Sequence, residues 1–64
     1  MSLWSKKDFL LRVKIAKKEA KETKYWLSLI DLKDNQELEK TRASLVNETT
    51  ELMKIFGAII EKSQ

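Results

Sequence analysis

One stretch decides the fold: residues 9–32, FLLRVKIAKKEAKETKYWLSLIDL. Small and apolar side chains recur along it in steps of three and four residues, at Phe9, Val13, Ala16, Ala20, Thr23, Leu27 and Ile30. These steps place the side chains in one stripe along one face of an α-helix. The stripe is narrow at its two alanines, where a neighbouring helix can approach closely, and bulky at its ends.

Composition restricts the chain to one small, helix-rich domain. It has 64 residues, of which 36% are charged, with one Gly and no Pro, Cys or His. Such a composition is typical of long helices. A domain below about 70 to 80 residues rarely holds its fold without disulfides, a metal or self-association. Because Cys and His are absent, we expect self-association to stabilise this one.

The same sequence excludes several classes of protein. No apolar run approaches the roughly 20 residues that a membrane span requires, and the N-terminus lacks the apolar core of a signal peptide. We therefore expect a cytoplasmic protein with no membrane partner. Nucleophile–base pairs, Gly-rich phosphate loops and metal-binding motifs are also missing from the sequence, so we expect no enzyme, no cofactor and no small-molecule substrate.

The start of the first helix is marked by its capping residues. Ser5 followed by Asp8 has the spacing of a capping box, and Trp4 with Phe9 has that of a hydrophobic staple. These patterns predict a first helix over about residues 6–31.

A second capping pattern starts the second helix. The chain breaks at about residues 31–34, and Asp34 with Glu37 has capping-box spacing. A helix is therefore predicted over about residues 35–62. Its apolar stripe consists of Leu38, Leu45, Leu52, Phe56 and Ile59.

The short turn makes the two helices antiparallel neighbours. Each helix also carries a second apolar line, formed by Ile15, Trp26 and Leu29 on the first and by Val46, Met53, Phe56 and Ile60 on the second. Two helices alone cannot cover both lines. The predicted fold is all-α, a two-helix antiparallel hairpin that forms one domain over residues 1–64 and self-associates into a four-helix bundle as a homodimer or higher homo-oligomer. The residues expected at the oligomer interface are Phe9, Val13, Ile15, Trp26, Leu27, Leu29, Leu52, Met53, Phe56 and Ile60.

Carboxylates are expected to meet at one level of the bundle, where Glu19 and Glu22 face Glu48 and Glu51. Carboxylates in a bundle core can hold a pair of metal ions, but the usual ligand set includes His, which this chain lacks. The favoured interpretation is a structural polar layer that fixes the register of the helices. Its expected members are Glu19, Glu22, Thr23, Arg42 and Glu48.

Lysines line one face of the first helix, at Lys7, Lys14, Lys17, Lys21 and Lys24. Residues 1–33 carry nine Lys or Arg against four Asp or Glu, a net charge of +5, and residues 34–64 carry four against six, a net charge of −2. This lysine line could follow a phosphate backbone, such as that of RNA. It lacks the Arg forks and interleaved aromatic residues that read bases, and a solvated bundle face has the same composition. Both interpretations stay open.

Several motifs resemble the second half of the bacterial "four helix bundle protein" family. They are Ser5-Lys6-Lys7-Asp8-Phe9, then Lys14-Ile15-Ala16-x-Lys18-Glu19-Ala20-x-Glu22-Thr23-x-Tyr25-Trp26-Leu27, then Glu48-x-x-Glu51-Leu52-x-Lys54-Ile55 with Ile59-Ile60. That family includes proteins encoded in intervening sequences of 23S rRNA genes and accessory proteins of diversity-generating retroelements. The resemblance covers residues 5–60, which match only the last two of the family's four helices.

The resemblance implies a helical bundle that assembles into oligomers, without known catalysis. Some members of the family associate with nucleic acid and a reverse transcriptase through a basic surface. Two functions are therefore expected of this chain: a non-catalytic self-assembly or interaction module, or, as the alternative, an RNA- or nucleic-acid-binding accessory protein that uses the lysine line.

Overall fold

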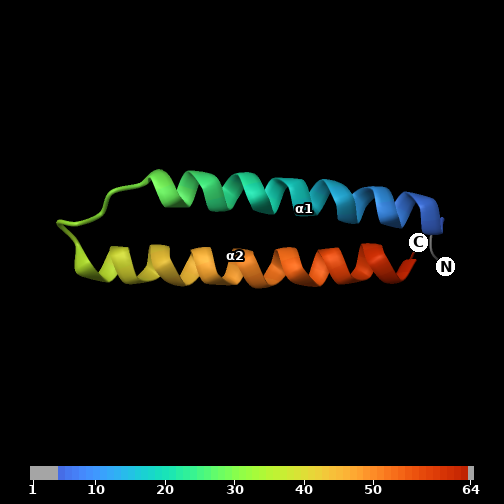
Figure 1. Cartoon of the computed structure of the whole chain (residues 1–64). Coiled ribbons are helices and arrows are strands. Elements are labelled where there is room, and N and C mark those ends of the chain that lie inside the picture. Colours follow the sequence, from blue (N-terminus) through green and yellow to red (C-terminus); the bar gives the residue numbers. More distant parts are fainter. Residues whose placement is uncertain (1–4, 64) are drawn as a thin grey trace.

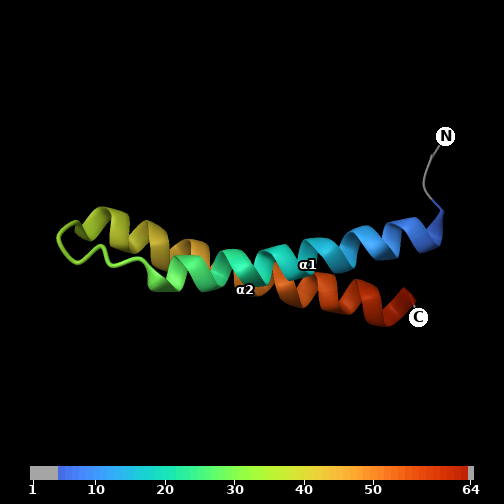
Figure 2. The ribbon, with the colours of Figure 1, turned by 90° about the horizontal axis from the view of Figure 1, so that it is seen from above.

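The computed structural model describes residues 5–63 and confirms an all-helical hairpin. Helix α1 spans Lys6–Leu29 and helix α2 spans Gln36–Ser63. The two run antiparallel along the length of the molecule, which measures 48 × 20 × 18 Å (Figure 1). Seen from above, they cross obliquely near their middles (Figure 2). The staple predicted for Trp4 lies outside the described residues.

The N-terminus of α1 is held by the predicted capping box. The Ser5 hydroxyl oxygen accepts a hydrogen bond from the Asp8 backbone N–H at 3.1 Å, and the Asp8 carboxylate accepts one from the Ser5 N–H at 3.3 Å. Two of the N–H groups that a helix start leaves without partners are thereby satisfied. At the other end α1 stops at Leu29, two residues before the predicted end, because Ile30 takes an extended conformation with ψ of 129°.

The cap predicted for α2 is wrong by one residue. Asp34 lies in the turn, and Asn35 caps the helix: its side-chain oxygen accepts from the Leu38 N–H at 3.1 Å and its carbonyl accepts from the Glu39 N–H at 2.9 Å. The turn itself explains the shift. The Asp31 carboxylate accepts from the Lys33 N–H at 3.1 Å, which folds the chain so that Asn35, and not Asp34, precedes the first helical residue.

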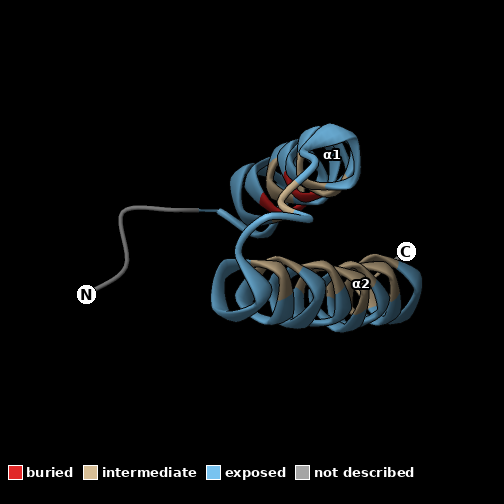
Figure 3. Ribbon diagram, turned by 90° about the vertical axis from the view of Figure 1, so that its left-hand side faces the viewer, coloured by how far each residue is buried: buried red, intermediate tan, exposed pale blue. Residues whose placement is uncertain are grey.

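Small residues allow the two helices to pack together. Val13 and Ala20 of α1 are 7% and 9% exposed, and they are the buried residues of the described chain. In the view along the helices, the buried segments lie on the side of α1 that faces α2 (Figure 3). We use the name seam for nine of the residues that the hairpin turns inward, which are Val13, Ala20 and Leu27 on α1, and Arg42, Val46, Thr49, Met53, Phe56 and Ile60 on α2. Other residues beside them, among them Ala16 and Ile59, are half-buried as well.

The stripe predicted for α2 is therefore rotated relative to the observed seam. Leu38, Leu45 and Leu52, which were expected to face α1, are 50%, 42% and 44% exposed. The residues four positions later, Arg42, Thr49 and Phe56, are half-buried instead. A step of four residues turns about 40° to 50° around a helix, so the leucines lie beside the seam and not in it.

Candidate functional site

Two rows of side chains lie beside the seam, one on each helix. On α1 the row is Phe9, Ala16 and Thr23 and continues to Ile30, just past the end of the helix; on α2 it is Leu38, Leu45, Leu52 and Ile59. Each row has a step of seven residues, which is close to two full turns, so its members share one direction. We call the two rows together the open face.

The two rows lie on the same side of the hairpin. Each row precedes the seam residues of its own helix by four positions, as Ala16 precedes Ala20 and Leu52 precedes Phe56. Both rows are therefore rotated from the seam in the same sense about their own helix axes. A twofold axis perpendicular to the plane of the hairpin relates two antiparallel helices. Rotation about this axis leaves both rows on the same side of that plane.

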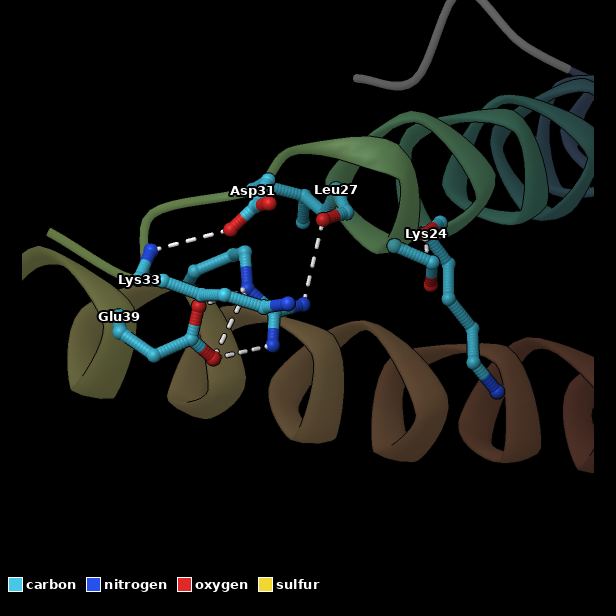
Figure 4. A network of polar contacts seen from close by, with 7 residues as sticks. Lys24, Leu27, Asp31, Lys33 and Glu39 are labelled. Atoms are coloured by element: carbon cyan, nitrogen blue, oxygen red, sulfur yellow. Dashed lines mark hydrogen bonds and ion pairs between the residues drawn. The ribbon is translucent and has the colours of Figure 1, made fainter.

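A cross-helix hydrogen bond sets the levels of the open face. The Arg42 guanidinium donates to the Leu27 carbonyl at 3.2 Å, which places these two residues at about the same height (Figure 4). Both helices rise by about 1.5 Å per residue in opposite directions. Thr23 therefore lies about level with Val46, next to Leu45, and Ala16 about level with Met53, next to Leu52.

The hairpin as a whole exposes more surface than a compact protein of its mass normally leaves in water. A compact monomer of this mass exposes about 4,200 Å² by the usual scaling of surface with mass. This chain exposes 5583 Å², an excess of about 1,300 Å². A stable protein interface covers about 800 Å² of each partner. The excess is thus larger than the area that each partner of one standard interface covers.

Further apolar residues extend the open face at its two edges. Two residues beside the rows lie on the same side of the hairpin: Ile55 follows Leu52 by three positions on α2, and Trp26 follows Thr23 by three positions on α1. They are 54% and 62% exposed. A shallow groove of about 340 Å³ lies beside Trp26, lined also by Glu19, Glu22 and Thr23.

The predicted polar layer does not form within one chain. Glu19, Glu22, Thr23 and Glu48 are exposed, and Arg42 pairs with Glu39, which sequence analysis did not include. The spacing explains the choice: Glu39 lies three residues before Arg42 on the same helix, within direct reach of its guanidinium. Among residues 5–63, no three carboxylates converge as a metal site would require.

Arg42 closes the seam at its turn end. Its Nε donates to both carboxylate oxygens of Glu39, at 2.9 and 3.1 Å, and its Nη2 bonds one of them as well. These hydrogen bonds lower the pKa of the Glu39 carboxyl and raise that of the Arg42 guanidinium. Because Arg42 also bonds the Leu27 carbonyl, it satisfies one of the last carbonyls of α1.

The lysine line lies on the opposite side of the hairpin from the open face. Lys17 follows Val13 by four positions, so it is rotated from the seam in the other sense. Its Nζ lies 3.7 Å from the place of a Cβ on Gly57, next to a groove of about 290 Å³. The groove is lined by Lys14, Lys17, Lys18 and Lys21, with Met53 and Ile60 beneath. Lys24 is half-buried, whereas the other four members of the lysine line are exposed.

The residues predicted for the oligomer interface divide into two groups. Val13, Leu27, Met53, Phe56 and Ile60 are buried or half-buried in the seam, whereas Phe9, Ile15, Trp26, Leu29 and Leu52 are exposed. In the first group, contacts within the hairpin already bury part of each side chain, and the interface itself stays a prediction. The residues predicted for the interface do not include Leu38, Leu45 and Ile55. The seven-residue step of the leucines is the pattern that would have found two of them.

Comparison with family models, with curated proteins and with solved structures gives no match to this chain. The resemblance to the four-helix-bundle family thus stays a prediction. Neither helix is both long enough and apolar enough to cross a membrane, over the residues that the structure describes.

Proposed function

We propose that the chain is a non-catalytic self-assembly module, of the four-helix-bundle type, whose open face packs against a second copy. The observation that carries this proposal is the row of Leu38, Leu45 and Leu52, each more than two-fifths exposed on one side of the molecule. A hairpin with two buried residues has little core of its own. A second copy would cover the leucines and supply the missing core.

Light scattering combined with circular dichroism tests this proposal. We expect a dimer or larger species whose melting temperature rises with protein concentration, because association stabilises the folded chain by mass action. Leu45→Asp would bury an unpaired carboxylate in the bundle, at a cost of about 3 kcal/mol, and should weaken association more than a hundredfold.

The matched control for this substitution is Leu11→Asp. Leu11 is 57% exposed and lies on the far side of α1 from both the seam and the open face. The Leu11→Asp substitution should leave the mass of the oligomer and its melting curve nearly unchanged. A wild-type monomer with a sharp melting transition independent of concentration would refute self-assembly, and so would equal effects of the two substitutions.

A second candidate function is binding of RNA or another nucleic acid along the lysine line. The observation that favours it is that, within residues 5–63, none of Lys7, Lys14, Lys17 and Lys21 takes part in an ion pair. Packing of two open faces would leave both lysine lines on the outside of the bundle, available to phosphates.

A salt series tests this second function. Affinity for single-stranded RNA should fall steeply as salt rises, with a slope that reflects the number of phosphates contacted. Lys14→Gln with Lys21→Gln should weaken binding and reduce that slope by about two. The control pair is Lys40→Gln with Lys62→Gln on α2, which removes the same charge elsewhere. Absence of binding at low salt would exclude this function.

A further inference from the structure

The side chains of the open face differ in size between its two helices. Its middle levels on α1 hold the small residues Ala16 and Thr23, whereas those on α2 hold Leu45 and Leu52. Because Ala16 lies about level with Leu52 and Thr23 with Leu45, the face has a shallow α1 half and a raised α2 half at its two middle levels, whereas both halves carry large residues at the two ends. A face of this shape does not fit every orientation of a second copy.

Two twofold arrangements can stack the open faces of two copies. If the axis runs along the helices, the turns of both copies lie at the same end, and α1 of one copy covers α2 of the other. If the axis runs across the helices, the turns lie at opposite ends, and each helix covers its own counterpart. Neighbouring helices are antiparallel in both arrangements, so helix dipoles do not distinguish them.

Side-chain size distinguishes the two arrangements. With the turns at the same end, Ala16 lies over Leu52 of the partner subunit and Thr23 over Leu45 of the partner subunit, so each small residue receives a large one. With the turns at opposite ends, the small residues of the two α1 helices meet and leave voids, while the leucines of the two α2 helices collide. Packing at protein density requires the former.

Net charge points to the same arrangement. Residues 1–33, which include α1, carry a net charge of +5, and residues 34–64 carry −2. Five of the nine basic residues of the first half belong to the lysine line, which lies away from the open face, so these net charges act at long range and not through contacts. At that range, turns at the same end place the basic half of each copy nearer the acidic half of the other. Turns at opposite ends place the two basic halves together. Arrangements that pair complementary charge are favoured over those that bring like charges together.

We infer that the partner is a second copy of this chain, packed with its turn at the same end, with α1 of each copy on α2 of the other. This inference rests on the proposed function, which it makes specific. The twofold axis lies along the helices, and both copies present their lysine lines outward.

The arrangement determines which glutamates face each other across the interface, and substituting lysine for them tests it. Glu19 lies three positions after Ala16, and Glu48 three positions after Leu45, so both are at the edge of the open face. With the turns at the same end, Glu19 of one copy faces Glu48 of the partner subunit. With the turns at opposite ends, each glutamate faces its own counterpart.

The charge-reversal experiment measures the dimer dissociation constant of three variants. Glu48→Lys should tighten the dimer about tenfold, since two like-charge contacts become two opposite-charge contacts. Glu19→Lys should do the same. The double variant should lose the gain, because lysine then faces lysine. With the turns at opposite ends, neither single variant would gain, and that result would overturn the inference.

Distances between spin labels on the two copies give an independent measurement. Because the chain has no native Cys, each label attaches only at the introduced cysteine. Labels on Lys33→Cys, in the turn, should lie within about 30 Å of each other, a few helix diameters apart. The opposite orientation would separate them by nearly the 48 Å length of the molecule. A label on Lys18→Cys, at mid-length, should give a short distance in either orientation and reports the dimer itself.

The two possible failures can be told apart. A monomer by light scattering, with no distance from the Lys18→Cys label, overturns both the proposed function and the orientation. A dimer with a short Lys18→Cys distance and a long Lys33→Cys distance overturns the orientation alone.

Discussion

The seam and the open face are built from the same repeat but differ in how far their side chains are buried. Val13 and Ala20 of the seam are buried, whereas Leu38, Leu45 and Leu52 of the open face are each more than 40% exposed. Large apolar side chains contribute most to stability when they are buried, at about 25 cal/mol per Å². The chain thus keeps much of its potential hydrophobic stabilisation on the outside, where it becomes available on association.

The largest effect expected within the seam comes from adding volume to it. Ala20→Leu would force α1 and α2 apart, since Ala20 is 9% exposed and sits where the helices meet. Overpacking of this kind costs about 1–3 kcal/mol. The melting temperature, measured at one fixed protein concentration, should fall by several degrees or more.

Ala58→Leu is the matched control for that change. Ala58 is exposed on α2, so the added side chain meets water and not the other helix. If both substitutions lowered the melting temperature equally, the loss would come from the leucine itself and the seam would not be packed as described.

The sequence predicted the hairpin and the first cap because those features depend on local spacing. Steps of three and four residues define a helix face, and Ser5 with Asp8 is a pattern that closes on itself. The rotation of α2 was not predictable in the same way. Its apolar stripe is two rows wide, and the pattern fixes the stripe but not which row meets α1 and which is left for another helix.

The cap of α2 offers a sharper test of this difference between local pattern and turn geometry. Asn35→Ala should destabilise the hairpin by about 1 kcal/mol, because the Leu38 N–H loses its acceptor. Asp34→Ala, which removes the residue that the pattern favoured, should have a much smaller effect. Thermal melts of both variants at equal concentration measure the contrast. Equal losses would mean that Asp34 also supports the turn.

Gly57 gives a smaller effect of opposite sign, on the side of the seam that carries the lysine line. The helix passes through this residue without interruption, and a Cβ placed on it would lie 3.7 Å from the flexible end of Lys17, an ordinary contact. Gly57→Ala should therefore stabilise the protein by about 0.5–1 kcal/mol, through the higher helix propensity of Ala. A decrease in melting temperature would show that the added methyl group clashes with α1, and hence that the helices lie closer together at Gly57 than described.

The smallest expected effect is a pH dependence at the polar end of the seam. Glu39 has a pKa below its ordinary value because Arg42 donates hydrogen bonds to its carboxylate. A carboxyl whose pKa is lower in the folded state contributes stability that is present above its unfolded pKa and is lost as the pH falls through its folded pKa. We therefore plot the free energy of unfolding of each protein against pH, relative to its own value near neutral pH. On acidification to below pH 4, the wild-type protein should lose slightly more of this free energy than Glu39→Gln does. Parallel acid curves for the two proteins would mean that this ion pair within α2 contributes no measurable stability.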